Sequence, residues 1–182
     1  MEVGYSAASM SMIAARLGGS KGTLYNYFRS KEELFEAYIV RHCAWQQEAM
    51  DELFSQGGDV RVALTGLGET LLRVVLSGFG LRNFILVISE AGRAPDMGRA
   101  FYDAGPQRGA TRLADFIARS ADEGRLRPCD SLAAAHQFVG LCQNRLLKAR
   151  LCNAAPEPTE AEIATEVAAA VETFMAAYGP RA

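Results

Sequence analysis

The sequence has no long apolar stretch. Its most apolar run, Phe84–Ser89, is far shorter than the roughly 18 uncharged residues that a membrane-spanning helix needs. The first residues also lack the basic segment followed by apolar residues that forms a signal peptide. We therefore expect a cytoplasmic protein without a membrane partner.

Residues that bind metals or perform catalysis are few and scattered. The four cysteines have neither CxxC spacing nor a histidine at ligand spacing: Cys43, Cys129, Cys142 and Cys152. We expect reduced, mostly buried thiols, with thiol sensing as the alternative. His42 and His136 have no serine, cysteine or carboxylate partner at a motif spacing, and His136 is expected in the core or an interface. The sequence predicts no metal, no cofactor and no enzyme; a small helical enzyme is the alternative.

The net charge is small but unevenly distributed. The whole chain carries a formal charge of −2. Residues 1–31 hold four basic residues against Glu2, a formal charge of +3, which leaves −5 for the remainder. This split fits a nucleic-acid-binding end attached to a body that avoids nucleic acid. Abundant alanine and few clustered β-branched residues predict an all-α fold.

The stretch Ser9–Leu34 contains two short predicted helices separated by glycines. Ser9 is placed to cap the first helix, and Gly18-Gly19 ends it, because glycine reaches the left-handed backbone conformation at little cost. The second helix spans Ser20–Phe28, with Ser20 as its cap. Helix, tight glycine turn and helix is the pattern of a helix-turn-helix.

One face of the second helix suits DNA. Leu24 and Phe28, four residues apart, are expected to face inward. Its other face carries residues that form hydrogen bonds or hold charge: Lys21, Thr23, Tyr25, Asn26 and Tyr27. Such groups are what a reader of the major groove needs. An ordinary solvated helix fits the same residues, and the pattern alone leaves both interpretations open.

A longer set of motifs resembles the DNA-binding domain of the tetracycline-repressor (TetR) family of bacterial regulators. The motifs that carry the resemblance are Gly4-Tyr5, Met10, Ile13-Ala14, Ser20-Lys21-Gly22-Thr23-Leu24-Tyr25, Tyr27-Phe28 and Ser30-Lys31-Glu32-Glu33-Leu34-Phe35. The resemblance implies that Ser20–Phe28 is the recognition helix and that Ser9 and Lys31 hold DNA phosphates. It implies DNA contacts by Ser9, Ser20, Lys21, Gly22, Thr23, Tyr25, Asn26, Tyr27 and Lys31.

The chain departs from the family pattern in two places. Gly19 stands where the family usually has a small apolar residue. The chain starts at Met1, so the family's first helix is almost wholly absent; we expect a start codon assigned too far downstream or a trimmed chain. An alternative function follows, namely a helical ligand-binding or scaffolding dimer that does not bind DNA because its head is incomplete.

The third helix and the body complete the expected all-α architecture. Ser30 and Glu33 form a capping-box pattern in which Glu33 reaches back to the Ser30 amide. The expected helices are Lys31–Ser55, with Trp45 and Leu53 among its anchors, Val60–Ser77, Leu81–Gly92, Ala94–Tyr102, Gln107–Glu123, Ser131–Leu151 and Thr159–Tyr178. Gly78–Gly80 is expected to break the helix that precedes it. Gly105-Pro106 is expected to interrupt or kink the helix that starts at Ala94. We expect a DNA-binding domain with the start of the connecting helix over residues 1–48, and a regulatory domain over 49–182.

The last two expected helices carry two apolar stripes each. One stripe serves the chain's own core, and the surplus stripe suggests a four-helix bundle across a twofold axis; a single larger core is the alternative. The resemblance likewise implies a homodimer through these helices. The expected interface residues are Ala135, Val139, Cys142, Leu146, Ala164, Ala168, Val171 and Met175.

The resemblance also implies a small-molecule effector bound inside the body. A mostly aromatic, weakly charged site suits a hydrophobic or amphipathic molecule. Candidate lining residues, each of which also fits plain core, are Phe79, Phe84, Ile88, Phe101, Phe116, Gln137, Phe138, Leu141 and Asn144. The expected function is therefore a repressor that binds a palindromic double-stranded DNA operator as a dimer and is released by the effector.

Overall fold

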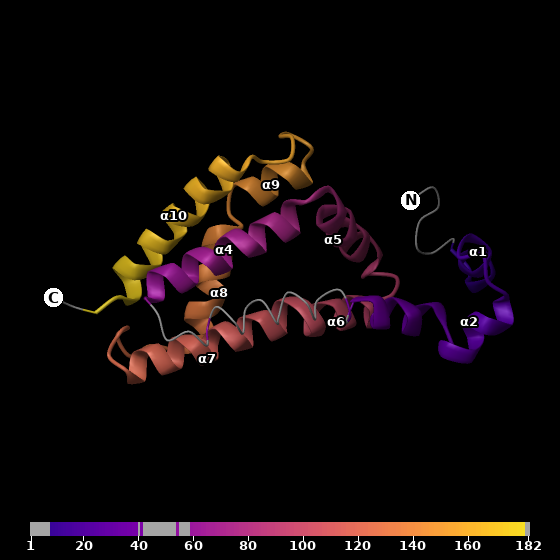
Figure 1. Ribbon diagram of the computed structural model, residues 1–182, viewed down its shortest axis with the longest axis horizontal. Helices are drawn as coiled ribbons and strands as arrows, with labels where there is room; N and C mark the ends of the chain where they lie inside the picture. The colour runs from indigo at the N-terminus through magenta and orange to yellow at the C-terminus, as the bar shows by residue number, and fades with distance from the viewer. Residues whose placement is uncertain (1–7, 40, 42–53, 55–58, 181–182) are drawn as a thin grey trace.

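The computed structural model describes residues 8–39, 41, 54 and 59–180. All regular structure in these residues is helical, which confirms the predicted all-α fold. A small head of α1 and α2 lies at one end of the molecule, and the C-terminal helix lies at the other (Figure 1). The elements are α1 (Met10–Arg16), α2 (Lys21–Tyr27), α4 (Val60–Leu76), α5 (Gly78–Glu90), α6 (Pro95–Tyr102), η2 (Asp103–Gln107), α7 (Arg108–Asp122), α8 (Ser131–Cys142), α9 (Leu146–Leu151) and α10 (Glu160–Tyr178).

The head has the predicted helix-turn-helix. The Ser9 Oγ accepts a hydrogen bond from the Met12 amide at 3.2 Å, and the Ser20 Oγ accepts one from the Thr23 amide at 3.0 Å. Each serine thereby satisfies an amide that the first helical turn leaves without a partner. Gly18 has φ +70°, the left-handed conformation that turns the chain between α1 and α2.

The third helix starts after Ser30 and is described through Ile39 and at Arg41. The Ser30 Oγ accepts from the Glu33 amide at 3.2 Å, as the capping box predicts. The reciprocal bond differs, because Glu33 Oε2 accepts from the Arg29 amide at 2.6 Å, one residue earlier than predicted. The predicted anchors Trp45 and Leu53, together with His42 and Cys43, lie outside the described residues, as does the domain boundary expected after residue 48.

Helices α6, η2 and α7 follow one another along one side of the body (Figure 1). The predicted interruption at Gly105-Pro106 is a single wide π-turn, η2, and the helical path continues through it. Pro106 lacks an amide hydrogen, and a π-turn is one way for a helix to accommodate a residue that cannot donate. An interruption at this place is therefore wrong, whereas a kink there stays a prediction.

A sharp corner joins α4 to α5, with their axes bent by 71°. The break lies at Ser77, not across Gly78–Gly80, which form the first turn of α5. The Ser77 hydroxyl donates to the Val74 carbonyl at 2.9 Å and accepts from the Gly80 amide at 3.0 Å. Ser77 therefore caps both helix ends at the corner.

Gly80 is required for this corner. A Cβ at position 80 would lie 2.0 Å from the Val74 carbonyl oxygen, a backbone atom that cannot move aside. We expect Gly80→Ala to lower the free energy of unfolding by about 1–3 kcal/mol, as over-packed sites do. Gly109→Ala is the matched control, because its Cβ would meet nothing within 4 Å. Urea denaturation of both variants measures the effect, and equal stabilities would contradict it.

The C-terminal region contains one helix more than the sequence predicts. The expected helix Ser131–Leu151 is wrong as a single element, since α8 ends at Cys142 and α9 begins at Leu146. Between them the Arg145 amide donates to Glu166 of α10 at 3.3 Å, and its guanidinium donates to the same carboxylate at 2.8 Å. The Arg145 amide thus donates to Glu166 of α10 and not to a carbonyl one turn earlier, as it would in a continuous helix.

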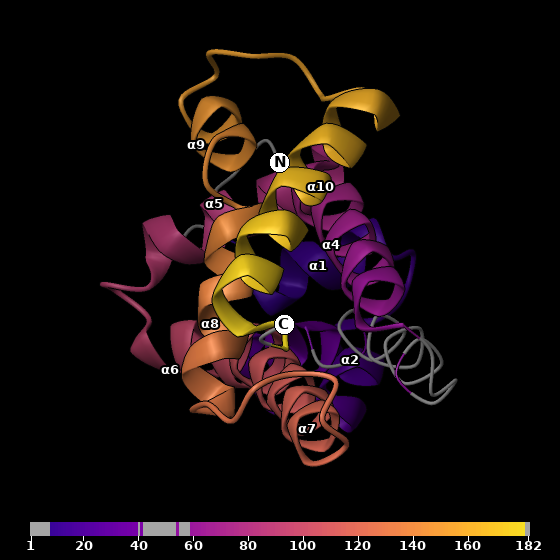
Figure 2. The same cartoon turned by 90° about the vertical axis from the view of Figure 1, so that its left-hand side faces the viewer.

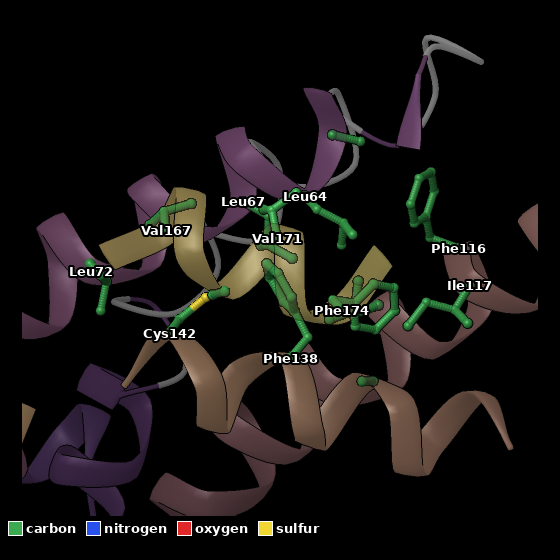
Figure 3. Packing of buried hydrophobic residues seen from close by; sticks show 14 of the residues in the cluster. Leu64, Leu67, Leu72, Phe116, Ile117, Phe138, Cys142, Val167, Val171 and Phe174 are labelled. Atoms are coloured by element: carbon green, nitrogen blue, oxygen red, sulfur yellow. The ribbon is translucent and has the colours of Figure 1, made fainter. Parts of the chain in front are cut away.

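Helices α4, α7, α8 and α10 surround the main core. Its largest fully buried side chains include Leu64, Ile117, Phe138, Val167 and Phe174, several of which Figure 3 shows in contact. The Phe138 and Phe174 rings meet edge to face at 5.5 Å between centroids, which joins α8 to α10. Within the residues that the structure describes, no single helix is long and apolar enough to cross a membrane; α4 and α5 meet that criterion only together, across their bend.

Candidate DNA-binding site and regulatory surfaces

The outer face of α2 presents the predicted contact residues together. Lys21, Gly22, Thr23, Tyr25, Asn26 and Tyr27 are all exposed. Leu24 and Phe28 are half-buried, as the predicted inner side requires. Tyr25 and Tyr27 keep 44% and 74% of their surface accessible.

Contacts within α2 arrange part of this face before any DNA arrives. The Ser20 and Thr23 hydroxyl oxygens lie 2.8 Å apart, and Ser20 also caps the helix. The Lys21 ammonium nitrogen lies 5.6 Å from the centroid of the Tyr25 ring, within the range of a cation–π contact. Lys21 and Tyr25 therefore stand side by side, one carrying charge and the other a hydroxyl donor.

The two expected phosphate contacts lie at helix starts. Ser9 is exposed at the N-terminus of α1, where its oxygen accepts from an amide and its hydroxyl proton remains a donor. Lys31 is half-buried at the first turn of the third helix. Arg16 and Arg29, exposed in the same segment, were not among the predicted contact residues. The charge count pointed to them, since residues 8–31 contain four basic residues and no acidic one.

The head contacts the body through Tyr38. Its hydroxyl accepts a hydrogen bond from the Asn83 side chain of α5 at 3.0 Å. Its ring meets the Phe79 ring edge to face at 6.5 Å. Phe35 and Ile39, on the same helix, pack with Phe101 and Ala104 in a second, smaller apolar cluster. The helix that follows the recognition helix thus touches α5, α6 and η2.

The nine candidate effector residues lie in four separate places. Phe84 and Phe101 meet edge to face at 6.2 Å, beside the smaller cluster, while Phe79 contacts Tyr38. Phe116 and Phe138 are buried in the main core. Gln137, Leu141 and Asn144 line an outward groove, and Ile88 is 58% exposed on α5. The structure therefore does not gather the set around one cavity.

The outward groove runs between α8 and α10, which lie next to each other on the face seen in Figure 2. It encloses about 350 Å³. Its lining residues are Gln137, Gly140, Leu141, Asn144, Thr173, Phe174, Ala177 and Tyr178. The Tyr178 hydroxyl donates to the Gln137 side-chain oxygen at 2.5 Å across one end. His136 is exposed on α8 and so does not lie in the core.

The expected interface residues divide between the inside and the outside of the chain. Ala135, Cys142, Leu146 and Val171 are buried in the chain's own core, Val139 and Met175 are half-buried, and Ala164 and Ala168 are exposed on α10. Other small residues of α10 are exposed as well, namely Ala161, Thr165, Ala169, Thr173 and Ala176, with Glu160, Glu162 and Glu172 among them. A surface of alanine and threonine beside a groove permits close approach by another helix.

Two of the three described thiols are poorly suited to redox sensing. Burial raises the pKa of Cys142 to about 12, so almost no reactive thiolate exists near neutral pH. Burial also raises the pKa of Cys129, with a further contribution from Asp130. Cys152 is exposed, and Cys43 lies outside the described residues. In the described part of the chain, no three histidine, cysteine or acidic side chains form a potential metal site.

Two TetR-family profiles match the sequence. Residues 1–38 match the bacterial regulatory proteins of the tetR family, and residues 62–180 match the C-terminal domain of AefR-like transcriptional repressors. A search of curated protein sequences found no match.

Solved structures of regulators share this fold. The flavonoid-responsive regulator FrrA is 32% identical over 100% of this chain and 91% of its own, with a TM-score of 0.84. A TetR-family transcriptional regulator of Mesorhizobium loti is 27% identical over 96% of this chain and 88% of its own, with a TM-score of 0.84. A second TetR-family regulator, from Pseudomonas syringae pv. tomato, is 25% identical over 97% of this chain and 88% of its own, with a TM-score of 0.74.

These matches agree with the geometry of the head. The helix-turn-helix of α1 and α2 lies within the residues that the first profile matches, and most of the helical body lies within those that the second matches. Regulators of this kind are non-enzymatic DNA-binding proteins, which confirms the prediction that the chain is not an enzyme. The chain belongs to the TetR family of bacterial transcriptional regulators.

Proposed function

We propose that the protein is a cytoplasmic repressor that binds a palindromic operator as a homodimer and leaves it when a hydrophobic small molecule binds. The observation that carries this proposal is the outer face of α2, where Lys21, Thr23, Tyr25 and Tyr27 are exposed. Groups of this kind fix a helix in the major groove and contact base edges there.

The dimer forms through α8 and α10. The groove between them and the small residues beside it form a surface that a second copy covers by twofold symmetry. This assignment moves the interface from the buried Cys142 to the groove residues Gln137, Gly140 and Leu141, and it retains Ala164 and Ala168. Two heads related in this way present their recognition helices to two half-sites, about 34–36 Å or a multiple apart.

The effector acts at the smaller apolar cluster. Phe84 and Phe101 lie there half-buried, beside the helix that carries Tyr38, so a ligand among them changes the contact between head and body. The similarity to FrrA, a flavonoid-responsive regulator, supports a planar aromatic effector. Edge-to-face phenylalanine pairs accommodate such a molecule well.

Fluorescence anisotropy tests the function directly. Labelled duplexes tile the DNA flanking the protein's own gene and are titrated with the purified chain. We expect one duplex to bind at nanomolar concentration, with a flavonoid weakening that binding by at least about tenfold while an unrelated polar metabolite has no effect. Binding that is equally weak on every duplex would contradict the proposed repressor. Specific binding that no hydrophobic compound weakens would contradict the proposed release.

A further inference from the structure

The loop between α9 and α10 is tied to the corner between α4 and α5. Glu157, in that loop, accepts a hydrogen bond from the Gly78 amide at 3.1 Å, so its carboxylate caps the first turn of α5. A carboxylate at a helix N-terminus interacts favourably with the unpaired amides and the helix dipole. A Cβ built at position 78 would lie 3.3 Å from an Arg82 guanidinium nitrogen and 3.7 Å from the Glu157 carboxylate, so opposite charges approach the same side of Gly78.

A second contact holds the other side of the corner. Arg73, one turn before Ser77 on α4, donates to Glu160 at 2.8 Å, and Glu160 is the first residue of α10. The start of α10 and the loop before it therefore hold both helices that meet at Ser77. Neither attachment is close in sequence to the helix that it holds, since 79 residues separate Gly78 from Glu157.

The same turn of α5 touches the head. Phe79, next to Gly78, meets the Tyr38 ring, and Asn83 donates to the Tyr38 hydroxyl. Only the first two turns of α5 separate the Glu157 carboxylate from the helix that follows the recognition helix. The orientation of α5 at the corner thus decides where Phe79 and Asn83 meet Tyr38.

We propose that Glu157 is a latch that fixes the angle of α5 and thereby couples the start of the C-terminal helix to the position of the DNA-binding head. With the latch closed, α5 holds Tyr38 and the head in one orientation. With the latch removed, α5 pivots at Ser77 and the head samples several orientations, of which only some match two half-sites. The loss of operator affinity rests on the proposed function, whereas the mechanical coupling does not.

Hydrogen–deuterium exchange of the full chain tests the coupling without DNA. Glu157→Ala is expected to speed exchange about three- to tenfold both in the first turns of α5 and in residues 35–39, because both lose a defined partner. Glu172→Ala is the matched control: it removes another contact between α4 and α10, the ion pair with Arg61, far from the corner. Faster exchange in α5 alone, or equal effects of the two variants, would overturn the latch.

Operator binding gives the second readout. We expect Glu157→Ala to weaken it about three- to tenfold and Glu157→Gln, which keeps an acceptor oxygen, to weaken it less. Tyr38→Phe removes the acceptor for Asn83. In the double variant Glu157→Ala/Tyr38→Phe we expect the loss of operator affinity to be less than the sum of the two single losses, because both substitutions act through the contact between α5 and Tyr38. Additive losses, or full affinity in Glu157→Ala, would overturn the proposal. If the wild-type chain binds no operator, the proposed function fails, and the exchange experiment still decides the latch.

Discussion

Gly140→Arg is expected to convert the protein to a monomer and to reduce operator affinity by more than about a hundredfold. Gly140 lines the groove on α8, and beyond its own helix a Cβ at this position would meet nothing within 4 Å in the described part of the chain. An arginine therefore fits the monomer, and it is also a better helix former than glycine. In the dimer it places an unpaired charge from each copy in an apolar contact, which is costly. Each head then binds a half-site alone, without the gain from linked sites.

Sedimentation velocity and anisotropy on the same samples measure these two effects. Gly109→Arg is the matched control, because this glycine of α7 also has open space at its Cβ and lies outside the groove. It should remain dimeric and bind DNA normally. A dimeric Gly140→Arg variant would place the interface elsewhere on the molecule.

Tyr25→Ala is expected to weaken specific operator binding by about 10- to 100-fold, the usual cost of losing one good recognition contact. Tyr25 is 44% exposed, and Lys21 lies over its ring, so the change removes a hydroxyl donor and also frees a neighbouring cation. The fold and the dimer should remain intact, because the side chain does not contribute to the core.

The matched control is Tyr102→Ala on α6, which removes a tyrosine of similar exposure, 49%, from a surface far along the chain from the recognition helix. Anisotropy with specific and scrambled duplexes separates sequence recognition from general phosphate binding. Equal affinity of Tyr25→Ala and the wild-type protein for the specific duplex would contradict the assignment of α2 as the recognition helix.

The sequence predicted the local features of this fold well. Ser9 and Ser20 each cap a helix as expected. Thr159 caps α10 in the same way: its amide donates to Glu162 at 2.8 Å, and the Glu162 amide donates back to the Thr159 hydroxyl oxygen at 3.3 Å. Capping depends on residues three positions apart, so a short stretch of sequence contains all the information. The exposed face of α2 was predictable for the same reason, since Leu24 and Phe28 alone set which side faces inward.

Features that depend on distant residues were not predictable. Gly78 and Gly80 suggested the end of a helix, but both lie in the first turn of α5, and the corner lies at Ser77. Gly80 is needed there because the Val74 carbonyl packs against it, a contact that the local sequence does not reveal. The turn after α8 depends on Glu166, 21 residues after Arg145. For the regulatory surfaces, helical periodicity finds two apolar stripes on α8 but does not say that the chain's own core covers both. Packing buries Ala135 and Cys142 of one stripe and Ala134 and Phe138 of the other, and it leaves Gln137 exposed.

A footprint of the wild-type protein on the DNA that it binds tests the central claim most directly. Two copies joined through α8 and α10 should protect two half-sites related by twofold symmetry, with centres one helical turn or a whole number of turns apart. Methylation interference should place the closest contacts in the major groove of each half-site. Protection of one half-site, or of a stretch without symmetry, would contradict a paired molecule that reads DNA with two copies of α2.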